Sequence, residues 1–226
     1  MKKRLLTTTA VLVFATTTML AGPASADTVE GVDEIVLATM IDGVMTPLSD
    51  EILDAALLDL DTPPPADPNT VTPYLIGFNV WVDCYIDNQE EKAFALYTRW
   101  WNGVGKDVRL KCGNQYWGYK HIQNGHQQDW QNKLDAARNA GWNQGTIATG
   151  GSWDDLMSAA TSSVILYPDH WTSRPVNDTT CVFATLSLVN VQTQQVVYEF
   201  NVRANYANNS DRLITSFPTK GTKCPG

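Results

Sequence analysis

The sequence lacks several features that would place it in a special class of protein. After the first 20 residues, no apolar run approaches the roughly 18 residues that a membrane-spanning helix needs. Only 18% of the 226 residues are charged and 43% are hydrophobic, which excludes a disordered chain, collagen and a coiled coil. Histidine and cysteine are scarce, with three and four residues, and the cysteine spacings fit no zinc-binding pattern. We therefore expect a globular chain without a membrane span, a metal or a cofactor.

The first 26 residues have the build of a secretory signal peptide. Three of the first four residues are basic, an apolar and threonine-rich stretch follows, and Ala24-Ser25-Ala26 has the small residues of a cleavage site. The sequence thus predicts a secreted, extracellular protein. All four cysteines lie beyond this segment, where an exported chain meets oxidising conditions.

Four cysteines allow three patterns of disulfide pairing. We favour Cys84 with Cys112 and Cys181 with Cys224, because each pair closes a segment of moderate length. In the chain-entropy model, a loop of that size stabilises the fold by roughly 3 to 4 kcal/mol.

Positive charge is absent from the start of the mature chain. Residues 27–68 contain eleven acidic residues and no lysine or arginine, whereas the residues that follow hold thirteen of each sign. Apolar residues recur at helical spacing after Ser49, which predicts an amphipathic helix over residues 50–60 with Ser49 as its N-cap. The proline-rich residues 62–68 cannot continue a helix and predict a semi-rigid linker.

The chain is therefore expected to have three parts: a signal peptide at 1–26, an acidic helical arm with a proline-rich linker at 27–73, and a disulfide-braced domain at 74–226. One interpretation of the arm is a solvated segment whose helix docks on the domain. The other is an inhibitory pro-segment that covers a positively charged site, its acids imitating a polyanionic substrate.

Both helix and strand patterns occur in the main domain. Apolar residues alternate strictly over residues 74–86, which predicts a strand with one buried face. Residues 92–101 and 108–112 favour a hairpin, but periodicity does not exclude a helix over residues 90–100. Residues 118–140 have apolar positions every three or four residues and predict a long helix. Ser152 and Asp155 have the spacing of a capping box at the start of a short helix through Ala160.

The last third of the chain has the pattern of β-strands. Three runs rich in β-branched and aromatic residues are separated by polar turns, at residues 181–191, 196–206 and 212–217. The simplest topology is an antiparallel meander. Because helices and strands are segregated along the chain, the expected fold class is α+β, with helices packed on an antiparallel sheet.

Candidate chemistry centres on His121 and His126, which lie close to the start of the predicted long helix. Imidazole exchanges protons near neutral pH, so a pair of histidines suits acid–base catalysis. Their five-residue spacing separates them by about 140° on an ideal helix. Each histidine alone fits a hydrogen-bonded residue at the edge of the core equally well. Asp154 and Asp155 form either a carboxylate pair or the acidic first turn of a helix.

Two short motifs resemble one family. Gly118-Tyr119-Lys120-His121-Ile122 with His126 is similar to the G-[YWF]-[KR]-H-I…H segment of the barnase/EndoU/colicin/RelE-like ribonuclease superfamily, which supplies many bacterial toxins. Residues 213–218 resemble the T-x-[FY]-P ending of its last sheet strand. The resemblance covers residues 117–218. It implies a metal-independent endoribonuclease, in which the ribose 2′-hydroxyl attacks the adjacent phosphorus and a cyclic phosphate forms.

The resemblance also implies roles for particular residues. His121 would be the general base or acid, and His126 would be its partner or hold it in orientation. Thr215 would donate a hydrogen bond to a phosphate oxygen. Lys120 and Arg203 would bind the negatively charged phosphate. Arg203 is included only because of its position on the predicted strand. The implied partners are RNA and either the acidic arm or a separate inhibitor.

A non-catalytic secreted binding protein is the alternative function. The domain has no net positive charge, whereas proteins that bind RNA are usually basic. The family's arginine before the second histidine is replaced here by Gly125. The partner would then be an envelope component, a protein or a glycan, and the last could stack on some of the eight tryptophans.

Overall fold

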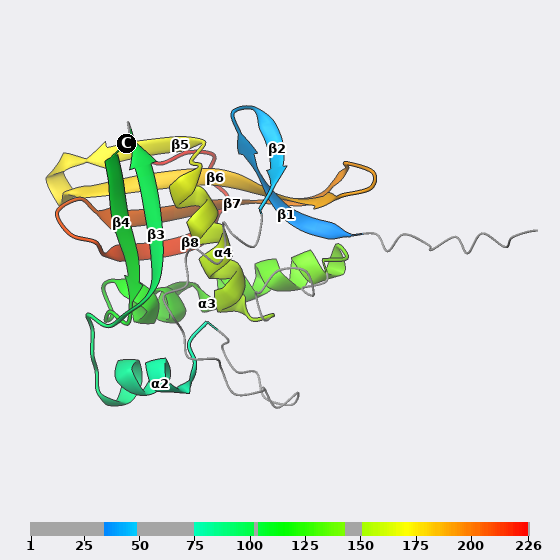
Figure 1. The fold of residues 1–226 in the computed structure, drawn as a ribbon. Helices are drawn as coiled ribbons and strands as arrows, with labels where there is room; N and C mark the ends of the chain where they lie inside the picture. Colours follow the sequence, from blue (N-terminus) through cyan, green and yellow to red (C-terminus); the bar gives the residue numbers. More distant parts are fainter. Residues whose placement is uncertain (1–33, 49–74, 102–103, 143–150, 226) are drawn as a thin grey trace, which may run out of the picture. The chain divides into compact units, whose positions relative to one another are not determined.

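An antiparallel sheet of six strands is the main layer of the fold (Figure 1). The computed structural model describes residues 34–48, 75–101, 104–142 and 151–225, all within the unit Asp33–Gly226. The strands of the sheet are β1 (Ile35–Ile41), β2 (Val44–Pro47), β5 (His170–Arg174), β6 (Thr179–Asn190), β7 (Val196–Ala207) and β8 (Leu213–Thr219). Their order is β2-β1-β6-β7-β8, and β5 pairs with the first half of β6. The predicted meander of β6, β7 and β8 is confirmed, and so is the α+β class.

Strand β1 revises the predicted boundary of the main domain. It pairs with β6 from Ile35 opposite Asn190 to Thr39 opposite Leu186, so this part of the segment 27–73 belongs to the sheet. The apolar run of β1 ends at Asp42-Gly43, whose φ angles of 50° and 81° form a tight hairpin turn into β2. An Asp-Gly pair after an apolar run is a strong hairpin signal, which the acidic composition of the segment obscured. The predicted signal peptide, the helix over residues 50–60 and the proline-rich linker lie outside the described residues.

Two helices pack on the sheet, as expected. Helix α3 (Gly118–Asn139) lies along the edge strand β8, and α4 (Trp153–Leu166) packs over β6 and β7. The apolar stripe of α3 is buried, with Trp130 and Ile122 fully enclosed. The predicted capping box at Ser152 and Asp155 begins α4, which continues beyond the predicted end to Leu166.

The ambiguous segment after residue 90 is a hairpin. Strands β3 (Ala93–Trp101) and β4 (Val104–Lys111) form a separate two-stranded antiparallel sheet. Because α4 packs against β3 as well as against β6 and β7, it lies between the hairpin and the main sheet. Asp211, in the turn before β8, binds Arg109 at 2.6 Å and Lys111 at 2.7 Å, which holds the hairpin to the main sheet.

The predicted strand over residues 74–86 is wrong. A short α-helix, α2 (Phe78–Trp81), continues there into a π-helical turn, η1 (Val82–Ile86). The buried positions Ile76, Val80 and Cys84 recur every four residues, which suits a helix. Two other apolar residues of the same alternation, Phe78 and Ile86, are 68% and 65% exposed. The alternation that predicted a strand therefore mixed one buried and one exposed set of apolar side chains.

Both predicted disulfides are confirmed. Cys84–Cys112 joins η1 to the end of β4, and Cys181–Cys224 joins β6 to the C-terminal residues. A 3-10 turn, η3 (Pro175–Asn177), lies between β5 and β6. None of the helices in the described ranges is long and apolar enough to cross a membrane.

Candidate functional site

The loop that leads into α3 is a turn that requires glycine at two positions. Gly113 and Gly118 both have positive φ angles, of 63° and 79°. A Cβ atom on Gly113 would lie 2.0 Å from the carbonyl oxygen of Trp117, and one on Gly118 would lie 2.8 Å from that of Lys111. These close approaches direct the chain from β4 straight into α3. They fix where the first turns of α3, and the histidines on them, lie.

The structure brings His121 and His126 together. Their ring centroids are 6.1 Å apart and the ring planes are nearly perpendicular. The ring of His126 also stacks on Phe217 of β8, with the centroids 4.6 Å apart. The Arg203 guanidinium, from the neighbouring strand β7, lies 5.7 Å from the centre of the same Phe217 ring. We call His121, His126, Phe217 and Arg203 the histidine row.

Hydrogen bonds define how the two imidazole rings are oriented. Nδ1 of His121 is 2.9 Å from the carbonyl oxygen of Gln115. Since a carbonyl oxygen only accepts, this Nδ1 carries the proton, and in the neutral ring Nε2 is then a proton acceptor. Nδ1 of His126 is 3.3 Å from a carboxylate oxygen of Asp129, three residues along the helix. Both histidines are partly exposed.

Strand register places Thr215 beside the histidine row. Arg203 lies opposite Phe217, and Asn205 lies opposite Thr215, so these four side chains share one face of the sheet. Thr215 is only 7% exposed. Its Oγ1, the Arg203 Nε and the Asn205 Oδ1 are buried without a hydrogen-bond partner in the described ranges. Thr215 is therefore next to the row, but its hydroxyl is closed off from solvent.

The C-terminal residues contact Arg203. Its Nη2 donates to the carbonyl oxygen of Lys223 at 2.9 Å, next to the disulfide of Cys224. The Nδ1 of His170, the third histidine, accepts from the backbone N–H of Cys224. His170 is the first residue of strand β5. The disulfide thus holds the chain end across the side of β7 that carries Arg203.

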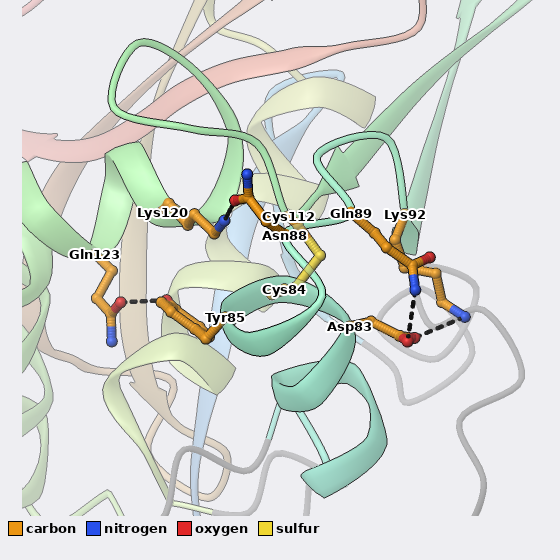
Figure 2. Close-up of a disulfide and its surroundings, with 9 residues drawn as sticks. All are labelled: Asp83, Cys84, Tyr85, Asn88, Gln89, Lys92, Cys112, Lys120 and Gln123. Carbon is orange, nitrogen blue, oxygen red and sulfur yellow. Dashed lines mark hydrogen bonds and ion pairs between the residues drawn. A yellow bond between two sulfur atoms is a disulfide. The ribbon is translucent and has the colours of Figure 1, made fainter.

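Lys120 lies apart from the histidine row. Its Nζ donates to Asn88 Oδ1 at 2.7 Å and lies 5.5 Å from the centre of the Tyr85 ring, on η1 (Figure 2). Consecutive residues on a helix point about 100° apart, so Lys120 faces η1 while His121 faces the row. The predicted grouping of Lys120 with Arg203 is therefore not found.

Sequence reasoning missed two members of the site, Phe217 and Asp129. Phe217 stands within the segment compared with the last strand of the ribonuclease superfamily, but no role was predicted for it. Asp129 follows His126 by three residues, and this spacing brings side chains together on one helix face. The three-residue spacing could therefore have predicted the contact between Asp129 and His126.

A second polar cluster surrounds the start of α4. Asp154 and Asp155 are both buried. The hydroxyl of Tyr119 donates to Asp154 at 2.9 Å, and the Ser152 hydroxyl donates to Asp155 at 2.6 Å. The two acids are thus both a carboxylate pair and the first turn of a helix. Burial raises the pKa of Asp155 to about 7, and the nearby charge of Asp154 contributes to the increase.

The raised pKa predicts that stability falls as the pH rises. Between pH 4 and 7 the folded protein holds a proton at Asp155 that the unfolded chain releases, so stabilisation present at pH 4 is lost by pH 8. The slope should reach about 1.4 kcal/mol per pH unit. Urea unfolding at several pH values measures this slope for the wild type and for Asp155→Asn. The variant keeps an oxygen acceptor for Ser152. The variant should have the flatter dependence between pH 4.5 and 7.5, and parallel curves would refute the raised pKa of Asp155.

Comparisons with known proteins give relatives but no function. The chain is 28% identical over 162 residues to a protein from each of two Mycobacterium tuberculosis strains, CDC 1551/Oshkosh and H37Rv, both named only as uncharacterised. The match covers 69% of this chain and 54% of each relative, so the chain spans about half the length of the curated relatives it matches. No family model and no solved structure matches the chain.

Among the residues with described positions, no group of three or more His, Cys, Asp or Glu side chains is arranged to hold a metal ion. The histidine row offers two imidazoles and a guanidinium, and Asp129 places a carboxylate behind one of the imidazoles.

Proposed function

We propose that the protein is a secreted endoribonuclease that cleaves RNA without a metal ion, with His121 and His126 as its acid–base pair. One observation supports this proposal most strongly. Each ring uses Nδ1 to donate to an oxygen acceptor, Gln115 for His121 and Asp129 for His126. No hydrogen bond within the described part of the chain engages either Nε2, and the ring centroids are 6.1 Å apart. Two imidazoles whose ring centres lie this far apart can both act on the reacting oxygens of one phosphodiester.

The hydrogen-bond partners suggest which ring is the base. A backbone carbonyl oxygen accepts from His121 Nδ1, so Nε2 is the nitrogen that can take a proton as the base. A carboxylate oxygen lies behind Nδ1 of His126 and orients that ring, as in other acid–base enzymes, which suits His126 to be the acid. In the proposed step, His121 Nε2 takes the proton of the ribose 2′-hydroxyl. The 2′-oxygen bonds to phosphorus, the bond to the 5′-oxygen breaks, and His126 Nε2 gives its proton to that oxygen.

Two neighbours of the pair suit a phosphate. Arg203 carries a guanidinium, which binds phosphate oxygens in a paired geometry. Gly125 lies one helical turn from His121 and directly before His126, and a Cβ atom on it would meet no atom within 4 Å. The missing side chain leaves the helix surface open between the two rings. The arginine expected from the resemblance is absent, and Arg203 supplies a cation from the sheet instead.

Incubation of purified protein with RNA in EDTA tests this function. The wild type should cut single-stranded RNA and leave 2′,3′-cyclic phosphate ends. DNA of the same sequence is the matched control, because it lacks the attacking 2′-hydroxyl and should stay intact. RNA left intact from pH 5 to 8, or cleavage that EDTA abolishes, would rule the proposal out.

The acidic residues of the N-terminal segment are also proposed to cover the site until the substrate or another factor displaces them. Since residues 35–47 contribute strands β1 and β2, this role falls to the acids outside the range 34–48. Removing residues 27–68 would remove strand β1, which belongs to the sheet. Neutralising substitutions are therefore the suitable probe of the acidic segment.

A further inference from the structure

Three aromatic side chains form a ladder on the α2–η1 helix. The ring centroids of Phe78 and Trp81 are 6.4 Å apart, and those of Trp81 and Tyr85 are 5.8 Å apart. Successive ring planes differ by only 17° and 25°. Phe78 is 68% exposed and Trp81 is 40% exposed. Phe78 and Trp81 therefore present nearly parallel rings to solvent, and the row ends in Tyr85, which is partly buried and packs against the core.

The ladder is fixed to the helix that carries the histidines. Lys120 and Gln123, on α3, both reach toward Tyr85 (Figure 2). The hydroxyl of Tyr85 donates to Gln123 Oε1, and the Lys120 ammonium lies 5.5 Å from the centre of the Tyr85 ring. The Cys84–Cys112 disulfide ties the residue before Tyr85 to the strand that leads into α3. The ladder thus ends beside Lys120, whose sequence neighbour is His121.

The charges around the ladder favour an anionic partner. Lys120 places a cation at the Tyr85 end. Asp83 lies on the far side of η1 from Tyr85 (Figure 2) and is paired with Lys92 at 3.1 Å. The Lys120 ammonium can form an ion pair with a phosphate, whereas to a neutral sugar it can only donate hydrogen bonds. Bases of single-stranded nucleic acid stack on aromatic faces, and an adjacent cation binds the phosphate between them.

We infer that Phe78, Trp81 and Tyr85 form a stacking subsite for single-stranded RNA, with Lys120 binding a phosphate between this subsite and the histidine row. The inference rests on the proposed ribonuclease function and extends it to a substrate several nucleotides long. It gives Lys120 a phosphate-binding role at a place other than the reacting phosphate. It also assigns a use to exposed aromatic side chains that the acid–base chemistry leaves out.

Steady-state kinetics with a short and a long substrate test the inference. The Phe78→Ala/Trp81→Ala variant should raise KM for a decaribonucleotide by about 5- to 100-fold, the range expected from stacking contributions. It should leave kcat for the decamer, and kcat/KM for a dinucleotide, within about twofold of the wild type, because neither needs the ladder. Trp171→Ala, at another exposed tryptophan, is the matched control and should leave KM unchanged. Unfolding curves of the variants should coincide with that of the wild type.

Failure of the subsite is distinguishable from failure of the enzyme. If the wild type cleaves RNA but the ladder variant has an unchanged KM for the decamer, the subsite is refuted and the ribonuclease stands. If the wild type cleaves no RNA, fluorescence anisotropy of a labelled decaribonucleotide shows whether the protein binds RNA without cutting it. Binding that the ladder variant weakens supports the RNA subsite without catalysis, whereas no binding refutes both. Binding of cellohexaose through Trp81 in place of RNA would refute the RNA assignment in favour of a sugar.

Discussion

Alanine at either His121 or His126 is expected to lower kcat for RNA cleavage by about 10²- to 10⁴-fold, the usual contribution of a positioned acid or base. KM should change little, because the rings are proposed to act on protons rather than to hold the RNA. The double variant should be only slightly slower than the slower single variant, since an acid and a base that act in one step are not additive. Rates at saturating RNA for the three variants measure this effect.

Matched substitutions separate catalysis from folding. Asp129→Asn keeps the shape of the side chain but removes the charge behind His126, so its kcat should fall between that of the wild type and that of His126→Ala. His170→Ala changes a histidine of β5 that is not a member of the row and that accepts from the backbone of Cys224, so it should keep the wild-type rate. Equal loss of activity in His170→Ala, or none in His121→Ala, would remove the two histidines from the mechanism.

Alanine at Trp130 is expected to lower the free energy of unfolding by about 3 to 5 kcal/mol, the range for removing a large buried aromatic side chain. Its ring is fully buried between α3 and β8, and its Nε1 donates to the carbonyl oxygen of Ser216 at 3.1 Å. The substitution leaves both a cavity and a buried carbonyl that has lost a hydrogen bond. Urea unfolding followed by circular dichroism measures the change.

Two other substitutions calibrate that loss. Trp130→Phe keeps most of the ring volume but loses the hydrogen bond, so it should cost less than Trp130→Ala. Trp81→Ala removes an exposed ring and should shift stability by less than about 0.5 kcal/mol. If Trp130→Ala and Trp81→Ala unfold at the same urea concentration, α3 is not held to β8 by Trp130. The stacking of His126 on Phe217 would then need another cause.

Local patterns predicted those parts of the fold whose cause is local. The long helix α3 follows from an apolar stripe at helical spacing that ends in Trp130, Leu134 and Ala137. The start of α4 follows from Ser152 and Asp155, and the meander follows from three strand-like runs with short polar turns. Both disulfides followed from the moderate length of the loops that they close.

The errors arose where burial depends on distant parts of the chain. Alternating apolar residues over 74–86 fit a strand, but the packing that buries Val80 and leaves Phe78 exposed makes the segment helical. Strand β1 was assigned to the acidic arm because composition outweighed an Asp-Gly turn. Its partner, β6, lies far along the chain, so the sequence around β1 contains little sign of the pairing.

The candidate site was predicted by residue type and only partly by position. The histidines were singled out for their proton chemistry, and their rings do approach one another. Lys120 was grouped with them because it is adjacent in sequence, but its side chain projects toward η1. Thr215 was selected from a motif, which does not reveal that its hydroxyl is buried. Side-chain direction and access to solvent depend on tertiary packing, which neither motif nor spacing determines.

The most direct test of the central claim uses a DNA oligonucleotide that contains a single ribonucleotide. If His121 activates a ribose 2′-hydroxyl and His126 protonates the leaving oxygen, the wild type in EDTA should cut once, on the 3′ side of that ribonucleotide. The upstream product should end in a 2′,3′-cyclic phosphate, and His121→Ala should cut at least about a hundredfold more slowly. An uncut oligonucleotide, a cut elsewhere, or wild-type cleavage by His121→Ala would contradict the account.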